Sequence, residues 1–161
     1  MNVSPKVTAA QKAFVVIILE GVPILLRDNA TSFLSFMCCV SAIDALAAYR
    51  YLSGSVERRF CDFISAYFPS EYGSHSKNLY GFRNRVLHNF TPANFSLVHS
   101  QPRIHLTPSQ IGDVYLDDGA FFSALRTAAV KFFREVAVDQ VRHDDMLSRL
   151  ENPKNGGEIY A

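Results

Sequence analysis

One short segment of the chain, Arg83-Asn84-Arg85-Val86-Leu87-His88, combines residue types that can carry out chemistry on a phosphate group. Histidine titrates near neutral pH, so it can accept and donate a proton during a reaction. Arginine presents a planar fork of N–H donors that fits phosphate oxygens and stabilises developing negative charge. As residue types, His88 can therefore exchange a proton, Arg83 can bind an anion, and Asn84 can donate or accept a hydrogen bond.

The helical periodicity of this region decides how the three side chains lie. At about 100° per residue, Asn84 and His88 fall on one flank of a helix, and Arg83 lies near the middle of its apolar face. That face is made by Leu79, Tyr80, Phe82, Val86, Leu87 and Phe90. An unpaired guanidinium there is costly, so Arg83 needs a partner or a water-filled cleft. Asp44, in an earlier apolar helix, is the obvious partner, and a purely structural arginine would make the same pair.

Four or five helices are expected from the spacing of apolar residues. They cover about residues 4–26, 30–52, 56–67, 74–90 and 118–150. Pro23 is expected to kink the last turn of the first helix, because proline lacks an amide hydrogen. Ser55 is expected to cap the third helix. The sequence therefore predicts a mainly α protein, an up-and-down bundle of four to five helices.

Short β-like runs interrupt the helical pattern before the closing helix. The runs 95–99 and 103–106 flank Ser100-Gln101-Pro102 and predict a small β-hairpin insertion, to which 114–116 adds a third short strand. Residues 1–150 are expected to form a single helical domain, and residues 151–161 a flexible C-terminal tail.

The composition indicates a folded chain without a general affinity for nucleic acid. Hydrophobic residues make up 48% and charged residues 19% of the 161 residues, as in a globular domain. The net charge of +1 means that binding to RNA would depend on a local patch. Three cysteines, two of them adjacent in an apolar run, indicate reduced thiols in a cytosolic protein.

Two apolar stretches, 14–26 and 33–48, raise the question of a membrane segment. Glu20 and Pro23 interrupt the first stretch and Asp44 interrupts the second, so neither reaches the roughly 20 apolar residues of a span. We expect both to be buried core helices of a cytoplasmic protein that does not associate with a membrane.

The stretch Tyr80-Gly81-Phe82-Arg83-Asn84-Arg85-Val86-Leu87-His88-Asn89 resembles the signature of the HEPN superfamily. That signature is an Arg, commonly followed by a polar residue such as Asn, and then a His after four to six intervening residues. Four residues intervene here, on a late helix of a bundle, where the family carries its motif. The stretch Ser41-Ala42-Ile43-Asp44-Ala45-Leu46 is also similar to the family's usual interior carboxylate on its second helix. The resemblance covers about residues 8–150.

The resemblance implies a metal-independent endoribonuclease of toxin or defence type. Such enzymes work as homodimers whose motif helices meet at a shared cleft, and they cleave RNA through attack by a 2′-OH. No cofactor or metal is implied, and an antitoxin or regulatory protein would be a further partner. The implied catalytic residues are His88, which would transfer protons, Arg83, which would bind the scissile phosphate, and Asn84, which would orient His88 or hold a phosphate oxygen. Asp44 would support them, and Arg85, Arg103 and Tyr80 would contact the substrate.

Two other interpretations stay open at this point. Some HEPN proteins lack nuclease activity and bind a protein partner or a nucleotide, and a helical bundle outside the family would keep Arg83 and Asp44 only as a buried pair. His99 and His105 lie on the expected hairpin, but no nearby Cys, Asp or Glu is expected to complete a metal-ligand set with them. Residues 143–145 are expected to form a solvated face of the last helix.

Overall fold

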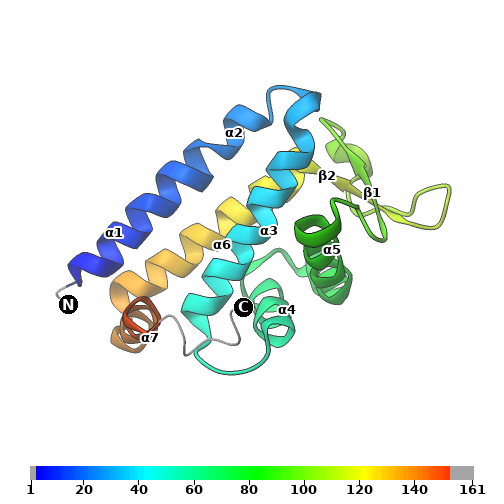
Figure 1. Ribbon diagram of the computed structural model, residues 1–161. Coiled ribbons are helices and arrows are strands. Elements are labelled where there is room, and N and C mark those ends of the chain that lie inside the picture. The colour runs from blue at the N-terminus through cyan, green and yellow to red at the C-terminus, as the bar shows by residue number, and fades with distance from the viewer. Residues whose placement is uncertain (1–2, 153–161) are drawn as a thin grey trace.

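The computed structural model describes residues 3–152 and shows a mainly helical chain (Figure 1). Its N-terminal helix is a continuous run made of α1 (Pro5–Phe14), the π-helical segment η1 (Val15–Glu20) and α2 (Val22–Leu25). Among the described residues, a two-stranded sheet stands before the last two helices. The prediction of a mainly α protein is confirmed at this level.

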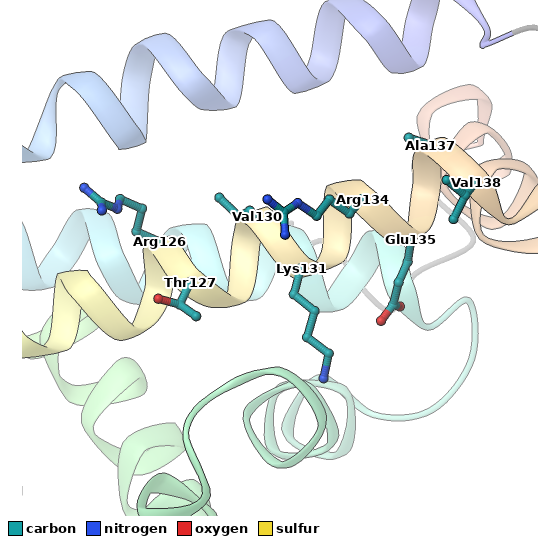
Figure 2. A pocket seen from close by; sticks show the side chains of 8 residues that line it. All are labelled: Arg126, Thr127, Val130, Lys131, Arg134, Glu135, Ala137 and Val138. Carbon is teal, nitrogen blue, oxygen red and sulfur yellow. The ribbon is translucent and has the colours of Figure 1, made fainter.

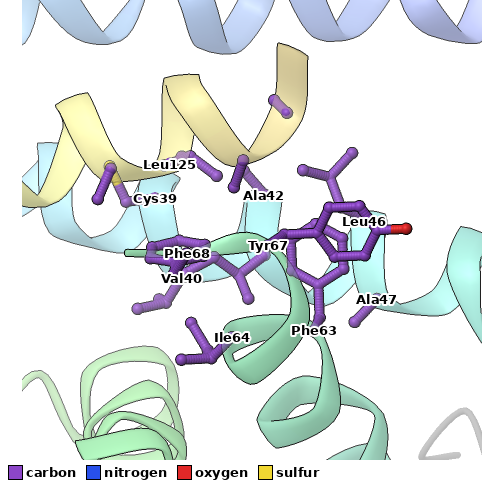
Figure 3. Packing of buried hydrophobic residues seen from close by; sticks show 14 of the residues in the cluster. Cys39, Val40, Ala42, Leu46, Ala47, Phe63, Ile64, Tyr67, Phe68 and Leu125 are labelled. Carbon is purple, nitrogen blue, oxygen red and sulfur yellow. The ribbon is translucent and has the colours of Figure 1, made fainter. Parts of the chain in front are cut away.

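The other helices pack around α3, the central element of the core. Their bounds are α3 Ser32–Arg50, α4 Val56–Tyr67, α5 Ser76–Asn89, α6 Asp118–Val138 and α7 Gln140–Glu151, with short 3-10 helices η2 Asn29–Thr31, η3 Ser70–His75 and η4 Pro102–Ile104. Because α4, α5, α6 and α7 all contact α3, its apolar side chains are buried on several sides. Figure 3 shows Leu46 of α3 beside Phe63 of α4 within this buried cluster.

Two helical runs, Pro5–Leu25 and Asn29–Arg50, are long and apolar enough to cross a membrane by length and composition alone. In the second run, half of the most apolar 18-residue stretch is buried inside the protein, which agrees with the prediction of a core helix. Only 17% of the corresponding stretch of the first run is buried. The N-terminal helix is therefore not the buried core helix that the sequence predicts, and it presents apolar side chains such as Ile17 and Ile24 to solvent.

The irregularity expected at Pro23 begins about two turns earlier, in the π-helical segment η1. Because Pro23 has no amide hydrogen for the carbonyl of Leu19, the hydrogen-bond ladder must change register near this point. The change brings the carbonyl oxygen of Ile17 so close to Gly21 that a Cβ atom there would collide with it. Glycine is therefore the residue that fits at position 21.

The predicted β-hairpin is wrong. Strands β1 (Phe95–Val98) and β2 (Val114–Asp117) pair in parallel, with Phe95 opposite Val114. The run 103–106 does not pair with β1, since Pro102, which has no amide hydrogen, starts the 3-10 helix η4. The backbone after η4 instead reaches the far edge of β2, where the amide of Leu106 donates to the carbonyl of Tyr115 at 2.8 Å.

The closing helix is not continuous to residue 150 as predicted, because it breaks at Asp139. The Asp139 carboxylate accepts from the amide of Val141 at 2.9 Å and thereby caps α7. The turn sends α7 back against α1 and α3. The predicted solvated face at 143–145 is consequently wrong for His143, which is 3% exposed and accepts from the amide of Ser4 at 3.0 Å.

Asp118, at the start of α6, ties the segment after β1 to the bundle. One of its carboxylate oxygens accepts from Ser32 Oγ at 2.6 Å and from His99 Nδ1 at 2.7 Å. Phe95 of β1 meets Phe82 of α5 edge to face at 5.4 Å between ring centroids. The insertion therefore packs against α5 and helps to hold this helix in place.

His105 links the insertion to η3 as a neutral ring. Its Nδ1 accepts from the amide of Asp117 at 3.0 Å, so Nε2 carries the hydrogen and donates to Tyr72 Oη at 2.7 Å. Burial lowers the pKa of His105 from its ordinary value of 6.5, although the charges of Asp117 and Glu71 oppose this. A second proton, on Nδ1, would face the Asp117 amide and break that bond.

This geometry predicts that acid destabilises the fold through His105. Below about pH 6.5 the unfolded chain binds a proton that the folded His105 resists, so the free energy of unfolding falls as the pH falls. We expect a contribution of at most about 1.4 kcal/mol per pH unit. Urea unfolding between pH 7.5 and 5 measures it: His105→Gln flattens the pH dependence, and the control His88→Gln, at an exposed histidine, leaves it unchanged. Equal slopes in all three proteins would contradict the assignment.

Candidate functional site

Arg83 projects from α5 toward α3 and pairs with Asp44, as the sequence predicts. Arg83 Nε donates to Asp44 Oδ2 at 2.5 Å, and Nη2 contacts the same oxygen. The two side chains are 18% and 19% exposed. The pair thus joins α5 to the central helix at a partly buried position, which removes the cost of a lone guanidinium in the apolar face.

Asn84 holds the other side of the same guanidinium. Its Oδ1 accepts from Arg83 Nη1 at 2.8 Å, so Asp44 and Asn84 together fix the plane of the arginine fork. Asn84 therefore orients Arg83 in this structure, rather than His88. Of the five N–H hydrogens of Arg83, three are directed at these two side chains, and one on each terminal nitrogen is left for an anion.

Arg59, which the sequence analysis did not single out, is a second cation near Asp44. It is 5% exposed and donates to the carbonyl of Gly54 at 3.1 Å. Burial raises the pKa of Asp44, and Arg83 and then Arg59 oppose that rise through their positive charges. A signal was available in the sequence, since Arg59 occupies an apolar face of α4 beside Phe60 and Phe63.

His88 lies in the last turn of α5 and is exposed. It makes no hydrogen bond or ion pair with the described residues, so neither ring nitrogen has a partner among them. Arg83 and His88 are five residues apart, which sets them about 140° apart around the helix. A single copy of α5 therefore keeps the arginine inward, against α3, and the histidine outward, on the flank of Asn84.

The end of α5 carries an exposed aromatic residue that the sequence analysis assigned to the buried face. Phe90 is 68% exposed and adopts the left-handed conformation, with φ of 54°. Such a conformation is uncommon for a bulky residue. It turns the chain away from α5 and leaves the phenyl ring at the surface, two residues from His88.

The three secondary candidates lie in different settings. Tyr80 packs against Phe60, and its ring centroid is 6.0 Å from the Arg83 guanidinium carbon. Arg85 is exposed on α5, and Arg103 is exposed on η4 within the insertion. Tyr80 therefore belongs to the surroundings of Arg83, whereas the other two contribute surface charge.

A broad hollow on the described surface lies away from these residues. It has a volume of about 720 Å³ and is lined by α6 residues, including Arg126, Val130, Arg134 and Val138 (Figure 2). No cluster of three or more metal-ligating side chains exists among residues 3–152.

Comparison of this chain with protein-family models, with curated proteins and with solved structures finds no match in any of the three.

Proposed function

We propose that the protein is a metal-independent endoribonuclease of toxin or defence type, active in the cytoplasm as a homodimer. The observation that supports the proposal is that α5 carries one fixed cation and one exposed histidine. Arg83 is anchored by Asp44 and Asn84, and His88 is exposed with unoccupied ring nitrogens. An immobilised cation and a free histidine on one helix suit phosphodiester cleavage.

The chemistry follows from these two groups. His88 of one subunit removes the proton from an RNA 2′-OH, and the 2′-oxygen attacks the adjacent phosphorus. The bond from phosphorus to the 5′-oxygen breaks, and that oxygen takes a proton from His88 of the second subunit. The products are a 2′,3′-cyclic phosphate and a 5′-OH end. The N–H groups of Arg83 that remain free bind the non-bridging phosphate oxygens as negative charge builds up.

The requirement for two subunits has a geometric reason. Base and acid must act on opposite sides of the phosphorus, which one histidine cannot easily do. The exposed surface at the end of α5 includes Arg85, His88 and Phe90. Two such surfaces, related by a two-fold axis, would place two histidines across one cleft, with the phenyl rings as apolar contacts around it.

A second candidate is a catalytically inactive module of an up-and-down helical bundle of the HEPN type, which binds a protein partner or a nucleotide. One observation favours it: three of the five N–H hydrogens of Arg83 are already engaged inside the subunit. In that case Arg83 stabilises the fold and His88 is an ordinary surface residue.

Expression in a bacterial host separates the two candidates. We expect the parent protein to slow growth and degrade cellular RNA, and His88→Ala to abolish both effects. His75→Ala, which changes another histidine just before the same helix, is the matched control and should behave as the parent does. Equal growth and intact RNA with all three proteins would favour the inactive module.

A further inference from the structure

A groove runs between the N-terminal helix and α6, apart from the proposed nuclease site. Its walls come from apolar residues of both helices, among them Val15, Leu19, Val130 and Ala137, and it adjoins the larger hollow on α6. Val130 is 39% exposed within it. No residue of the motif on α5 lines the groove, because α5 packs against α3 and α4 instead.

The charged side chains that line this groove and its adjoining hollows, and that have no partner among residues 3–152, are all cations. Lys12, Arg126 and Arg134 line it or its adjoining hollows and make no hydrogen bond or ion pair with residues 3–152. Figure 2 shows Arg126 and Arg134 on the side of α6 that faces the N-terminal helix. Glu20 is exposed on the N-terminal helix but does not line the groove.

Lys131 and Glu135 also line the hollow on α6, but both already have hydrogen-bond partners on the side toward α4. Lys131 donates to the carbonyl of Ala66 at 2.7 Å, and Glu135 accepts from Tyr67 Oη at 2.5 Å. These contacts bind α6 to α4. The unpaired cations are thus confined to the side of α6 that borders the apolar groove.

We propose that this groove binds an acidic amphipathic helix of a partner protein. Helices commonly dock by laying an apolar stripe into a groove between two other helices, and carboxylates beside the stripe would meet the three free cations. The stretch from Arg126 to Val138 is about 20 Å long at 1.5 Å per residue, enough for three to four helical turns. The proposal is independent of the nuclease proposal, since it uses none of the same residues.

Two other occupants fit this groove less well. A second copy of this face, packed by a two-fold axis, would bring Arg126 and Arg134 toward their own counterparts, and like charges repel. A planar lipid surface would meet the exposed ridge of the N-terminal helix at Val16 and Ile17, rather than the half-buried side chain of Leu19 in the groove.

A designed peptide of about 15 residues tests the proposal. The probe carries leucine at helical spacing on one face and glutamate on the other, with a fluorescent label, and a counterpart carries lysine in place of glutamate. Fluorescence polarisation with the full chain should show saturable binding of the glutamate peptide and none of the lysine peptide. The affinity should fall with added salt, because the cations of the rim are exposed.

Charge reversal locates the binding. We expect Arg126→Glu together with Arg134→Glu to weaken the glutamate peptide by about tenfold or more. The matched control, Arg58→Glu together with Lys77→Glu, makes the same change in net charge at exposed positions on α4 and α5 and should bind as the parent does. Circular dichroism melting curves confirm that both double variants are folded.

Four results would overturn the proposal. The first is that the glutamate peptide shows no saturable binding, and the second is that both double variants lose the same affinity for it. The third is self-association of the parent protein that only the reversal on α6 abolishes. The fourth is binding to phosphatidylglycerol vesicles in place of the peptide. Sedimentation measures the last two. Cleavage assays on the α6 variants keep the two proposals apart, because this reversal leaves the nuclease residues untouched.

Discussion

Asp44→Ala should lower the free energy of unfolding by about 2–4 kcal/mol, because Arg83 and Arg59 both lose the carboxylate that balances their charge. The Arg83 guanidinium loses the acceptor for its Nε hydrogen. Arg59, which is almost wholly buried, loses its attraction to the same carboxylate. Urea unfolding at pH 7 measures the loss, with the denaturant dependence used to check that the unfolded state is unchanged.

Two comparisons show whether the cost comes from the unpaired charge. Asp62→Ala removes the exposed Arg58–Asp62 pair and should change stability by less than about 0.5 kcal/mol. Arg83→Met combined with Asp44→Leu should recover most of the loss, since an apolar pair of similar volume leaves fewer buried charges. If Asp44→Ala behaved as Asp62→Ala does, the Arg83–Asp44 pair would contribute nothing to the attachment of α5.

His88→Ala should reduce the rate of RNA cleavage by about 100-fold or more, the usual loss when a general acid or base is removed. Its melting temperature should stay that of the parent, because His88 is exposed and makes no bond with the described residues. Asn84→Ala should lose about tenfold, since Asn84 acts by orienting Arg83. Single-turnover cleavage of a labelled RNA oligonucleotide gives the rates, and His75→Ala should retain the parent rate.

A fall in the melting temperature of His88→Ala would show instead that His88 stabilises the fold. Asn84→Gln gives a second test of the role of Asn84. If Asn84 positions Arg83 for phosphate binding, the cleavage rate of Asn84→Gln should be little higher than that of Asn84→Ala. The reason is that the longer side chain displaces the oxygen that accepts from Nη1.

Local signals in the sequence predicted the elements around α5 well. The helix over 56–67 has the expected bounds, and Ser55 accepts from the amide of Arg58 at 3.2 Å, as a capping residue does. The Arg83–Asp44 pair was predictable because a charge in an apolar face demands a partner, and only a few acids stand in apolar helices. Both inferences depend on rules that act within one helix or on one buried group.

Features that depend on contacts between distant segments were not predictable in this way. Short β-like runs show no preference for one partner over another, so the parallel pairing of 95–98 with 114–117 could not be distinguished from a hairpin. The capping role of Asp139 and the burial of His143 both follow from the reversal of α7. Apolar periodicity similarly predicted the N-terminal helix without showing that much of its apolar surface stays exposed.

Analysis of the RNA ends tests the central claim most directly. A chimeric oligonucleotide with one ribonucleotide in a DNA strand, and a second with 2′-deoxy at that position, are incubated with the parent protein and with His88→Ala in the presence of EDTA. The parent protein should cleave only the first, leaving a 2′,3′-cyclic phosphate and a 5′-OH by mass spectrometry, and His88→Ala should leave both intact. Cleavage of the 2′-deoxy strand, a 3′-OH end, or equal cleavage by His88→Ala would contradict attack by the 2′-OH with His88 as the proton-transfer residue.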